Sequence, residues 1–211
     1  MYFLSKELIF PDVAEADADG LLAVGGDLST ERLLMAYRNG IFPWFNPDDP
    51  ILWWSPDPRM VLLFDNLIVS KSMRSVLKKQ VFEITFNKDF EGVISNCQKA
   101  PRPGQNGTWL TDEMKAAYVE LHKLGHAKSV ETWQNGELVG GLYGIDLGNV
   151  FCGESMFSKV SNASKAAFIS LAKKLQAENY LLLDCQIHND HLESLGCREI
   201  PRSLFIRALK S

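Results

Sequence analysis

The chain has 211 residues, of which 46% are apolar and 23% are charged, and its formal net charge at pH 7 is −4. This composition is typical of a folded globular protein that buries a sizeable core, and it argues against a disordered chain. No internal period suggests a repeat array. The negative charge also excludes the broad basic field of nonspecific duplex-binding proteins, so any contact with RNA must be local.

Neither an export signal nor a cysteine motif is expected from this sequence. Residues 1–11 lack the long apolar stretch of a signal peptide, and no apolar run approaches the roughly 20 residues that a membrane span requires. The four cysteines form no CxxC pair, which argues against a zinc cluster and against a disulfide framework. We therefore expect a cytoplasmic protein without a membrane partner.

Residues 1–57 are predicted to form a small N-terminal lobe. Ser29 is placed to cap a helix over residues 30–38, which Gly40 would end. Residues 41–59 contain five prolines and three of the five tryptophans in the chain. Because proline breaks helices and the hydrogen-bond ladders of central strands, we expect a rigid aromatic loop here.

Residues 58–211 are predicted to form a second domain of the α/β class. Its first part alternates strands at residues 60–64 and 81–86 with helices at residues 71–79 and 90–98. Thr111 is then placed to cap a helix that ends at Gly125, after a loop rich in proline and glycine.

Three strands follow, at residues 129–133, 138–145 and 149–157. The pairs Asn135-Gly136 and Gly148-Asn149 between them are strong hairpin signals, so an antiparallel meander is predicted. Asn162 is placed to cap a helix, which precedes a buried strand at residues 180–187 and a polar turn at residues 188–191. The second domain is therefore expected to contain a mixed, largely antiparallel sheet.

The strand at residues 180–187 carries a carboxylate in an apolar setting. Asp184 and Gln186 lie two apart, so they project from one face of the strand, roughly 7 Å from each other. The neighbouring residues are apolar or cysteine, and burial of an ionised carboxylate is costly unless a partner or a function explains it. A structural hydrogen bond to a backbone turn and a catalytic role both stay open.

A second acid lies in the middle of the strand at residues 149–157. Val150, Cys152, Glu154 and Met156 are predicted to share one face of this strand. Gly153 leaves space on the other face, which marks either a bulge or a close approach of another group.

Eight short motifs rich in Trp, Gly and Pro occur along the chain: Gly-Leu-Leu-Ala-Val-Gly-Gly-Asp-Leu at 20–28, Gly-Ile-Phe-Pro-Trp-Phe at 40–45, Leu-Trp-Trp-Ser-Pro-Asp-Pro-Arg at 52–59, Gly-Thr-Trp at 107–109, Phe-Cys-Gly-Glu-Ser-Met-Phe-Ser at 151–158, Asn-Ala-Ser-Lys at 162–165, Asp-Cys-Gln at 184–186 and Ser-Leu-Gly at 194–196. In order and spacing they resemble the leucyl/phenylalanyl-tRNA-protein transferase family. The resemblance covers residues from about 8 to 203.

This resemblance implies a small N-terminal lobe (residues 1–57) packed on an acetyltransferase-like domain of the GNAT type (residues 58–211). It implies an aminoacyltransferase that moves Leu or Phe, and by extension Met, from aminoacyl-tRNA to the N-terminal amino group of proteins beginning with Arg or Lys. We expect a monomer. The product would be marked for N-end-rule degradation. No pyrophosphate loop follows the strand at residues 149–157, so acetyl-CoA is not expected, and no cofactor is implied.

By the same resemblance the catalytic residues are Asp184, Gln186 and Glu154. In the implied scheme the Asp184 carboxylate polarises Gln186, whose carbonyl accepts a hydrogen bond from the attacking amine, with Glu154 beside them. Alternatively, a hydroxyl of the RNA shuttles the proton and the three side chains only orient the acceptor. Asp184 and Glu154 would also attract an acceptor that carries two positive groups.

Trp44 and Trp109 match the residues of the family that lie near the terminal adenosine of the tRNA, where a base stacks on an indole. For Trp53 and Trp54 core packing is preferred. The implied pocket for the amino-acid side chain is apolar, which suits Leu and Phe but leaves the preference between them open. It consists of Leu142, Phe151, Met156, Phe168, Leu171 and Leu183.

The helix at residues 71–79 carries the main concentration of basic side chains. Lys71, Arg74 and Lys78 share one helical face and Lys79 lies beside it. This stripe is either a solvated helix face or a landing place for phosphates of the tRNA acceptor stem.

Other residues with reactive side chains are assigned no chemistry. The polar turn His188-Asn189-Asp190-His191 is a weak metal pattern, so no metal is expected, and Cys152 and Cys185 are interpreted as packing residues. Two alternatives stay open: another GNAT-like N-acyltransferase, with a thioester donor or other acceptor rules, and a non-catalytic module that binds the tRNA acceptor end. Such a module would use Trp44 and Trp109 but not the three polar residues of the implied catalytic set.

Overall fold

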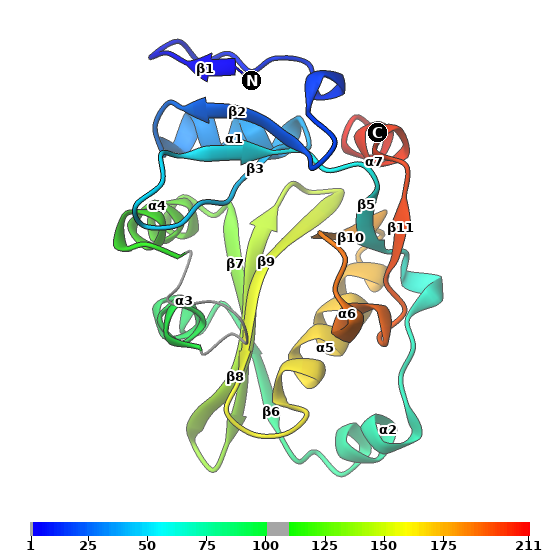
Figure 1. The fold of residues 1–211 in the computed structure, drawn as a ribbon. Helices are drawn as coiled ribbons and strands as arrows, with labels where there is room; N and C mark the ends of the chain where they lie inside the picture. The colour runs from blue at the N-terminus through cyan, green and yellow to red at the C-terminus, as the bar shows by residue number, and fades with distance from the viewer. Residues whose placement is uncertain (1, 101–109) are drawn as a thin grey trace.

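The computed structural model describes residues 2–100 and 110–211, whose strands form two sheets (Figure 1). The smaller sheet has the order β1-β2-β4-β3, with β1 at Tyr2–Leu4, β2 at Leu21–Gly25, β3 at Phe42–Pro43 and β4 at Leu52–Trp54. The larger sheet has the order β11-β5-β10-β9-β8-β7-β6. Its strands are β5 (Arg59–Leu62), β6 (Glu83–Phe86), β7 (Ala127–Gln134), β8 (Glu137–Asp146), β9 (Val150–Ser158), β10 (Leu182–Gln186) and β11 (Arg198–Ile200).

The helices are α1 (Thr30–Arg38), α2 (Lys71–Lys78), α3 (Phe90–Lys99), α4 (Asp112–Lys123), α5 (Ala163–Ala177), α6 (Asp190–Glu193) and α7 (Arg202–Leu209), with 3-10 turns at Val13–Glu15 and Phe64–Asn66. Within the described residues, no helix combines the length and apolar character that a membrane crossing needs.

Helix caps and turns were predicted well where a local side chain determines them. The Ser29 hydroxyl accepts a hydrogen bond from the Arg32 amide at the start of α1, and the Thr111 hydroxyl accepts one from the Met114 amide at the start of α4. Asn162 precedes α5 as predicted, but its backbone is left-handed (φ 71°) and its side chain makes no capping hydrogen bond. Capping by the Asn162 side chain was therefore a wrong prediction.

The aromatic segment at residues 41–59 is not purely a loop, because β3 and β4 form inside it. Pro43 is tolerated since β3 is an edge strand of the small sheet, and β4, which lies between β2 and β3, contains no proline. The prolines therefore excluded fewer strands than we expected from their number.

The mixed, largely antiparallel sheet is confirmed. Strands β7, β8 and β9 form the predicted antiparallel meander, β10 pairs parallel to β9, and β5 pairs antiparallel to both β10 and β11. The polar turn predicted at residues 188–191 contains the start of α6, and β11 and α7 were not predicted.

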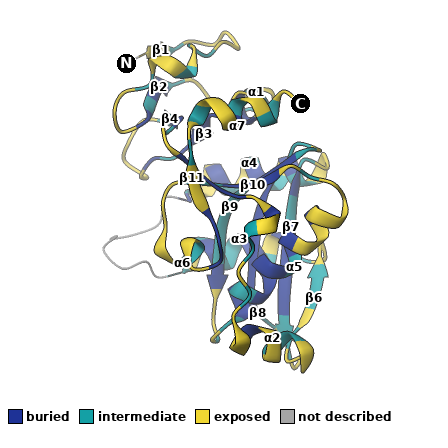
Figure 2. Ribbon diagram, turned by 90° about the vertical axis from the view of Figure 1, so that its right-hand side faces the viewer, coloured by how far each residue is buried: buried dark blue, intermediate teal, exposed yellow. Residues whose placement is uncertain are grey.

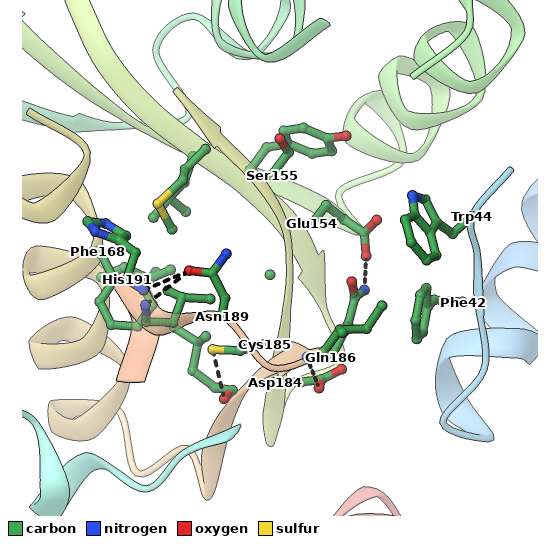
Figure 3. Close-up of a pocket in the computed structure, with 18 of the residues that line it drawn as sticks. Phe42, Trp44, Glu154, Ser155, Phe168, Asp184, Cys185, Gln186, Asn189 and His191 are labelled. Carbon is green, nitrogen blue, oxygen red and sulfur yellow. Dashed lines mark hydrogen bonds between the residues drawn. The ribbon is translucent and has the colours of Figure 1, made fainter. Parts of the chain in front are cut away.

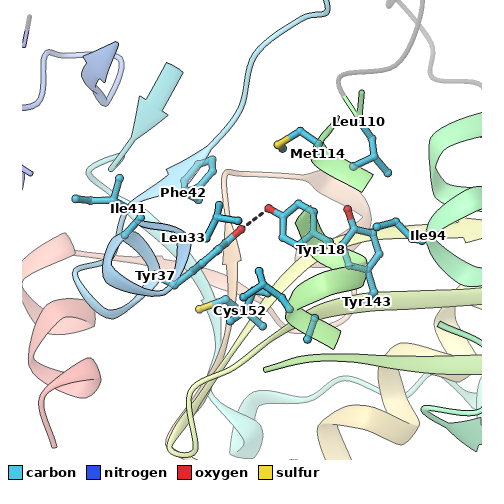
Figure 4. Packing of buried hydrophobic residues seen from close by; sticks show 14 of the residues in the cluster. Leu33, Tyr37, Ile41, Phe42, Ile94, Leu110, Met114, Tyr118, Tyr143 and Cys152 are labelled. Atoms are coloured by element: carbon cyan, nitrogen blue, oxygen red, sulfur yellow. Dashed lines mark hydrogen bonds between the residues drawn. The ribbon is translucent and has the colours of Figure 1, made fainter. Parts of the chain in front are cut away.

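Two buried clusters cover opposite faces of the large sheet, whose inner strands are mostly buried (Figure 2). One contains Phe168 of α5 and Met73 of α2. The other joins Tyr118 of α4 to Leu33 and Tyr37 of α1, so the small N-terminal sheet and the large sheet share one core (Figure 4).

Gly196 gives a test of the connection between α6 and β11. Its φ is 101°, and a Cβ at this position would lie 1.9 Å from the Asn66 carbonyl oxygen, whereas Gly136 has a φ of 80° and open space around the Cβ position. We expect Gly136→Ala to cost about 1 kcal/mol of unfolding free energy for the left-handed backbone alone, and Gly196→Ala to cost about 3 kcal/mol because overlap is added. Urea denaturation measures both, and equal losses would contradict the packing at Gly196.

Candidate active site

A cavity of about 560 Å³ opens where the parallel pairing of β9 and β10 ends (Figure 3). The last paired residues are Cys152 on β9 and Asp184 on β10. Each strand then contains an extra residue relative to its other neighbour, Glu154 opposite β8 and Cys185 opposite β5. Such bulges bend a strand and redirect its side chains, so the two bulges define the walls of the cavity.

The bulge at Glu154 overturns one prediction about β9. Val150 and Cys152 pack in the cluster that contains Tyr118, but Met156 packs in the cluster that contains Phe168, on the opposite face of the sheet. The four residues therefore do not share a face, because one extra residue reverses the alternation. Gly153 serves the bulge and also a close approach, since a Cβ there would lie 3.3 Å from the Asp184 carbonyl oxygen.

Asp184 is fully buried and forms a bidentate ion pair with Arg59 of β5. Its Oδ1 accepts from Arg59 Nε at 2.8 Å and its Oδ2 accepts from Arg59 Nη2 at 2.7 Å. Oδ1 also accepts from the backbone amide of Gln186 at 2.9 Å. The buried charge is thus explained by a cationic partner, and one of its contacts is a hydrogen bond to a backbone turn.

Gln186 connects this ion pair to the cavity. Its backbone has a φ of 66°, and its side-chain Nε2 donates to Glu154 Oε1 at 2.7 Å. Asp184 therefore accepts a hydrogen bond from the backbone amide of Gln186, whereas the side-chain amide of Gln186 donates to the Glu154 carboxylate. This differs from the scheme implied by the resemblance, in which Asp184 polarises the side chain.

Glu154 is the half-buried carboxylate of a hydrogen-bond chain that crosses three elements. Its Oε2 accepts from the Tyr118 hydroxyl of α4 at 2.8 Å, and that hydroxyl lies 2.5 Å from the Tyr37 hydroxyl of α1 (Figure 4). Burial raises the pKa of the Glu154 carboxyl to about 7, although hydrogen bonds from Tyr118, Tyr37 and Gln186 favour the ionised form. The carboxyl thus titrates near neutral pH, as a proton acceptor requires.

One wall of the cavity is apolar and includes most of the predicted side-chain pocket, namely Leu142, Met156, Phe168, Leu171 and Leu183. Phe151 does not line the cavity, although it is buried in the same cluster. Its ring points toward β8, where a Cβ on Gly144 would lie 2.5 Å from it.

The small N-terminal sheet supplies an aromatic wall on the far side of Glu154 and Gln186 (Figure 3). Phe42 and Trp44 line the cavity, and the Trp44 ring lies 5.7 Å from that of Trp54. Trp53 is fully buried in the core, as predicted, and Trp54 is half-buried. The predicted stacking residue Trp109 lies outside the described residues.

Residues of the α6 segment form the remaining rim. His188, Asn189 and His191 line the cavity, and the Asn189 side chain caps α6. Ligand atoms of His188, Asp190 and Glu193 lie within 4.8 Å of one another, but all three side chains are exposed. Exposed acidic groups of this kind are common without a bound metal.

The basic side chains of α2 are exposed and do not line the cavity. Arg74 and Lys78, together with Lys173 of α5, border a separate hollow of about 500 Å³ between the two helices. Lys71 and Lys79 lie at the two ends of α2. The structure therefore separates the predicted phosphate contacts from the predicted chemistry.

Among the residues in or beside the cavity that the sequence reasoning missed are Arg59, Phe42, Tyr37 and Tyr118. A signal existed for Arg59, because a carboxylate in an apolar strand requires a cation and Arg59 closes one of the quoted motifs. Nothing in the sequence links Tyr37 to Tyr118, which lie 81 residues apart and meet only through the fold.

Comparisons with known proteins give one consistent result. Residues 61–210 match the family model described as leucyl/phenylalanyl-tRNA protein transferase, and residues 26–57 match the model of its N-terminal domain. Proteins named leucyl/phenylalanyl-tRNA–protein transferase from Flavobacterium johnsoniae and Flavobacterium psychrophilum are 68% and 65% identical over the full length of both chains.

Likeness to solved structures is much weaker. A ribosomal-protein-alanine N-acetyltransferase from Brucella melitensis is 16% identical, with a TM-score of 0.34 over 47% of this chain and 75% of that one. A likeness of this size says nothing about chemistry.

The raised pKa of Glu154 has a consequence for stability. A carboxyl whose pKa rises from 4.5 to about 7 on folding holds its proton more tightly in the folded state. The free energy of unfolding should therefore fall, relative to Glu154→Gln, as the pH rises from about 4.5 to about 7, by about 1 to 3 kcal/mol. Parallel urea titrations of both proteins at several pH values test this. If the unfolding free energy of the unmodified protein, relative to that of Glu154→Gln, stays constant or grows over that range, the pKa of the Glu154 carboxyl is not raised by folding.

Proposed function

Because this chain belongs to the leucyl/phenylalanyl-tRNA protein transferase family, we propose that it transfers Leu or Phe from aminoacyl-tRNA to the N-terminal amino group of proteins that begin with Arg or Lys. The observation that supports this most directly is one cavity that combines an apolar wall with the hydrogen-bonded pair Glu154 and Gln186. The reaction takes place in the cytoplasm and marks the product for N-end-rule degradation.

The apolar wall receives the side chain of the donor amino acid. Leu142, Met156, Phe168, Leu171 and Leu183 offer only hydrocarbon, ring and thioether surface, which suits Leu, Phe and Met. Trp44 stacks on the terminal adenine, a contact that contributes about 1 to 3 kcal/mol and needs no base-specific hydrogen bond. Trp109 is assigned the same role from its sequence motif alone.

In the chemical step the acceptor amine attacks the ester carbonyl, a C–N bond forms and the bond to the ribose oxygen breaks. The amine proton must leave, and the departing ribose oxygen must gain one. Since Gln186 Nε2 donates to Glu154, Gln186 Oε1 is left to accept a hydrogen bond from an approaching amine. The pKa of the Glu154 carboxyl, about 7, allows it to take up a proton near neutral pH. The ester is already activated, so no nucleoside triphosphate is consumed.

One carboxylate, rather than two, attracts the positive charges of an acceptor that begins with Arg or Lys. Arg59 neutralises Asp184 inside the protein, so Glu154 provides the charge at the cavity. Helix α2 binds phosphates of the acceptor stem, away from the chemistry, and positions the tRNA without reading the amino acid.

The proposal is tested by incubating the purified protein with labelled Leu-tRNA or Phe-tRNA and a peptide that begins with Arg. Label should move to the peptide, and it should not move to the same peptide with an acetylated N-terminus. Transfer from acetyl-CoA instead would indicate an ordinary N-acyltransferase. Tight binding of tRNA without transfer would indicate a non-catalytic binding module.

Glu154 and Gln186 should behave as one unit in kinetics. We expect Glu154→Gln and Gln186→Ala each to lower kcat about 100-fold, and the double variant to lose little more than the more impaired single variant, because each change breaks the same hydrogen-bonded arrangement. Single-turnover transfer from Leu-tRNA measures all three proteins. Multiplicative losses in the double variant would mean that the two side chains act separately.

The phosphate contacts should appear in the salt dependence of tRNA binding. Lys71→Ala, Arg74→Ala and Lys78→Ala should each raise the Kd for Leu-tRNA and lower the slope of log Kd against log salt by about 0.7 to 0.9. Discrimination between Leu-tRNA and Phe-tRNA should not change. The exposed Lys123 on α4 offers a control, because its replacement by Ala should leave the slope unaltered. If the slopes of the α2 variants are also unaltered, the basic side chains of α2 contact solvent and not the tRNA.

A further inference from the structure

Arg59 lies where four parts of the chain meet. Besides its two bonds to Asp184, its Nη1 donates to the Gly40 carbonyl at 3.2 Å. The rings of Phe42 and Phe205 lie against the guanidinium, with their centroids 4.9 and 4.5 Å from Cζ. The side chain thus touches the end of α1, β3, β10 and the C-terminal helix α7, yet it does not line the cavity.

Asp184 connects Arg59 to the backbone of the bulge in β10. Its Oδ1 accepts from both Arg59 Nε and the Gln186 amide, so the guanidinium fixes the oxygen that holds Gln186. Gln186 is not glycine but has a φ of 66°, a conformation that costs about 1 to 2 kcal/mol and persists only where the surroundings impose it. From this backbone the side chain reaches Glu154.

We propose that Arg59 is a positioning residue for aminoacyl transfer: acting through Asp184, it holds Gln186 in the conformation that directs its amide at Glu154 and the cavity. The inference rests on the proposed function for its kinetic consequence, but its structural part does not. A bidentate fork is essential to it, because only a planar guanidinium fixes both carboxylate oxygens at once.

Arg59→Lys tests the role because it keeps the positive charge and removes the fork. With Gln186 released, Glu154 loses a hydrogen bond that favours its ionised form, so its titration should move to higher pH. The other groups that act on Glu154 are the hydroxyls of Tyr118 and Tyr37, the Cys152 thiol and the Asp184 carboxylate, and the substitution replaces none of them. We expect a midpoint about 0.5 pH unit higher or more by carboxyl NMR, and a kcat lower by about tenfold or more with little change in KM for Leu-tRNA.

Arg32→Lys is the matched control. Arg32 is also fully buried, but its guanidinium contacts Asp27 and the carbonyls of Ser5 and Glu7, away from the cavity. It should lose stability while the Glu154 titration and kcat stay as in the unmodified protein. Equal effects of the two Lys variants on kcat and on the titration would reduce Arg59 to a structural ion pair and overturn the proposal, as would an unchanged Arg59→Lys protein.

A second variant and a measurement on the unliganded protein complete the test. If Arg59→Lys does not fold, Phe205→Leu removes one ring from the guanidinium and should shift the Glu154 titration and kcat in the same directions by a smaller amount; no shift would overturn the proposal. If the unmodified protein transfers no amino acid, the proposed function fails, while the titration in the unliganded protein still decides whether Arg59 positions Gln186.

Discussion

The ion pair between Arg59 and Asp184 constrains the protein at its centre. Both side chains are buried, so removal of either partner would leave an uncompensated charge at a cost of about 3 to 5 kcal/mol. Around this pair lie Phe42 of the small sheet, Phe205 of the C-terminal helix and the strands β5 and β10. Segments from both ends of the chain therefore have one relative position in which the charges are satisfied, and the cavity is built on that position.

Two bulges convert an ordinary parallel strand pair into a site. Without the extra residues at Glu154 and Cys185, the pairing of β9 and β10 would continue and their side chains would alternate between the two cores. The bulges instead place a carboxylate and an amide together at the edge of an apolar cavity. An apolar surface and a hydrogen-bonded polar pair thus lie within a few residues of each other.

The acidic groups at the cavity and the basic side chains of α2 lie in separate parts of this acidic chain. The buried carboxylate of Asp184 is neutralised by Arg59. The half-buried carboxylate of Glu154 accepts hydrogen bonds from hydroxyl and amide donors, which lower its pKa and so oppose the effect of burial. The basic side chains of α2 lie on a separate surface. A protein with a net charge of −4 can therefore still present a local concentration of positive charge on one surface.

The sequence by itself determined the features that depend on neighbouring residues: the capped helices α1 and α4, the meander β7 to β9 with its hairpin turns, the mixed sheet and the ordered motifs that identify the family. Periodicity also showed that Asp184 and Glu154 were unusual, and Gly153 indicated that a bulge was one of two possibilities. Only the tertiary structure decided that Glu154 is the extra residue, that Arg59 is the partner of Asp184 across 125 positions, and that Tyr37 and Tyr118 complete the chain to Glu154. The physical reason is that a bulge is defined by the register with another strand, and a buried charge by whichever partner the packing brings within hydrogen-bond distance; neither is written in the spacing of one segment.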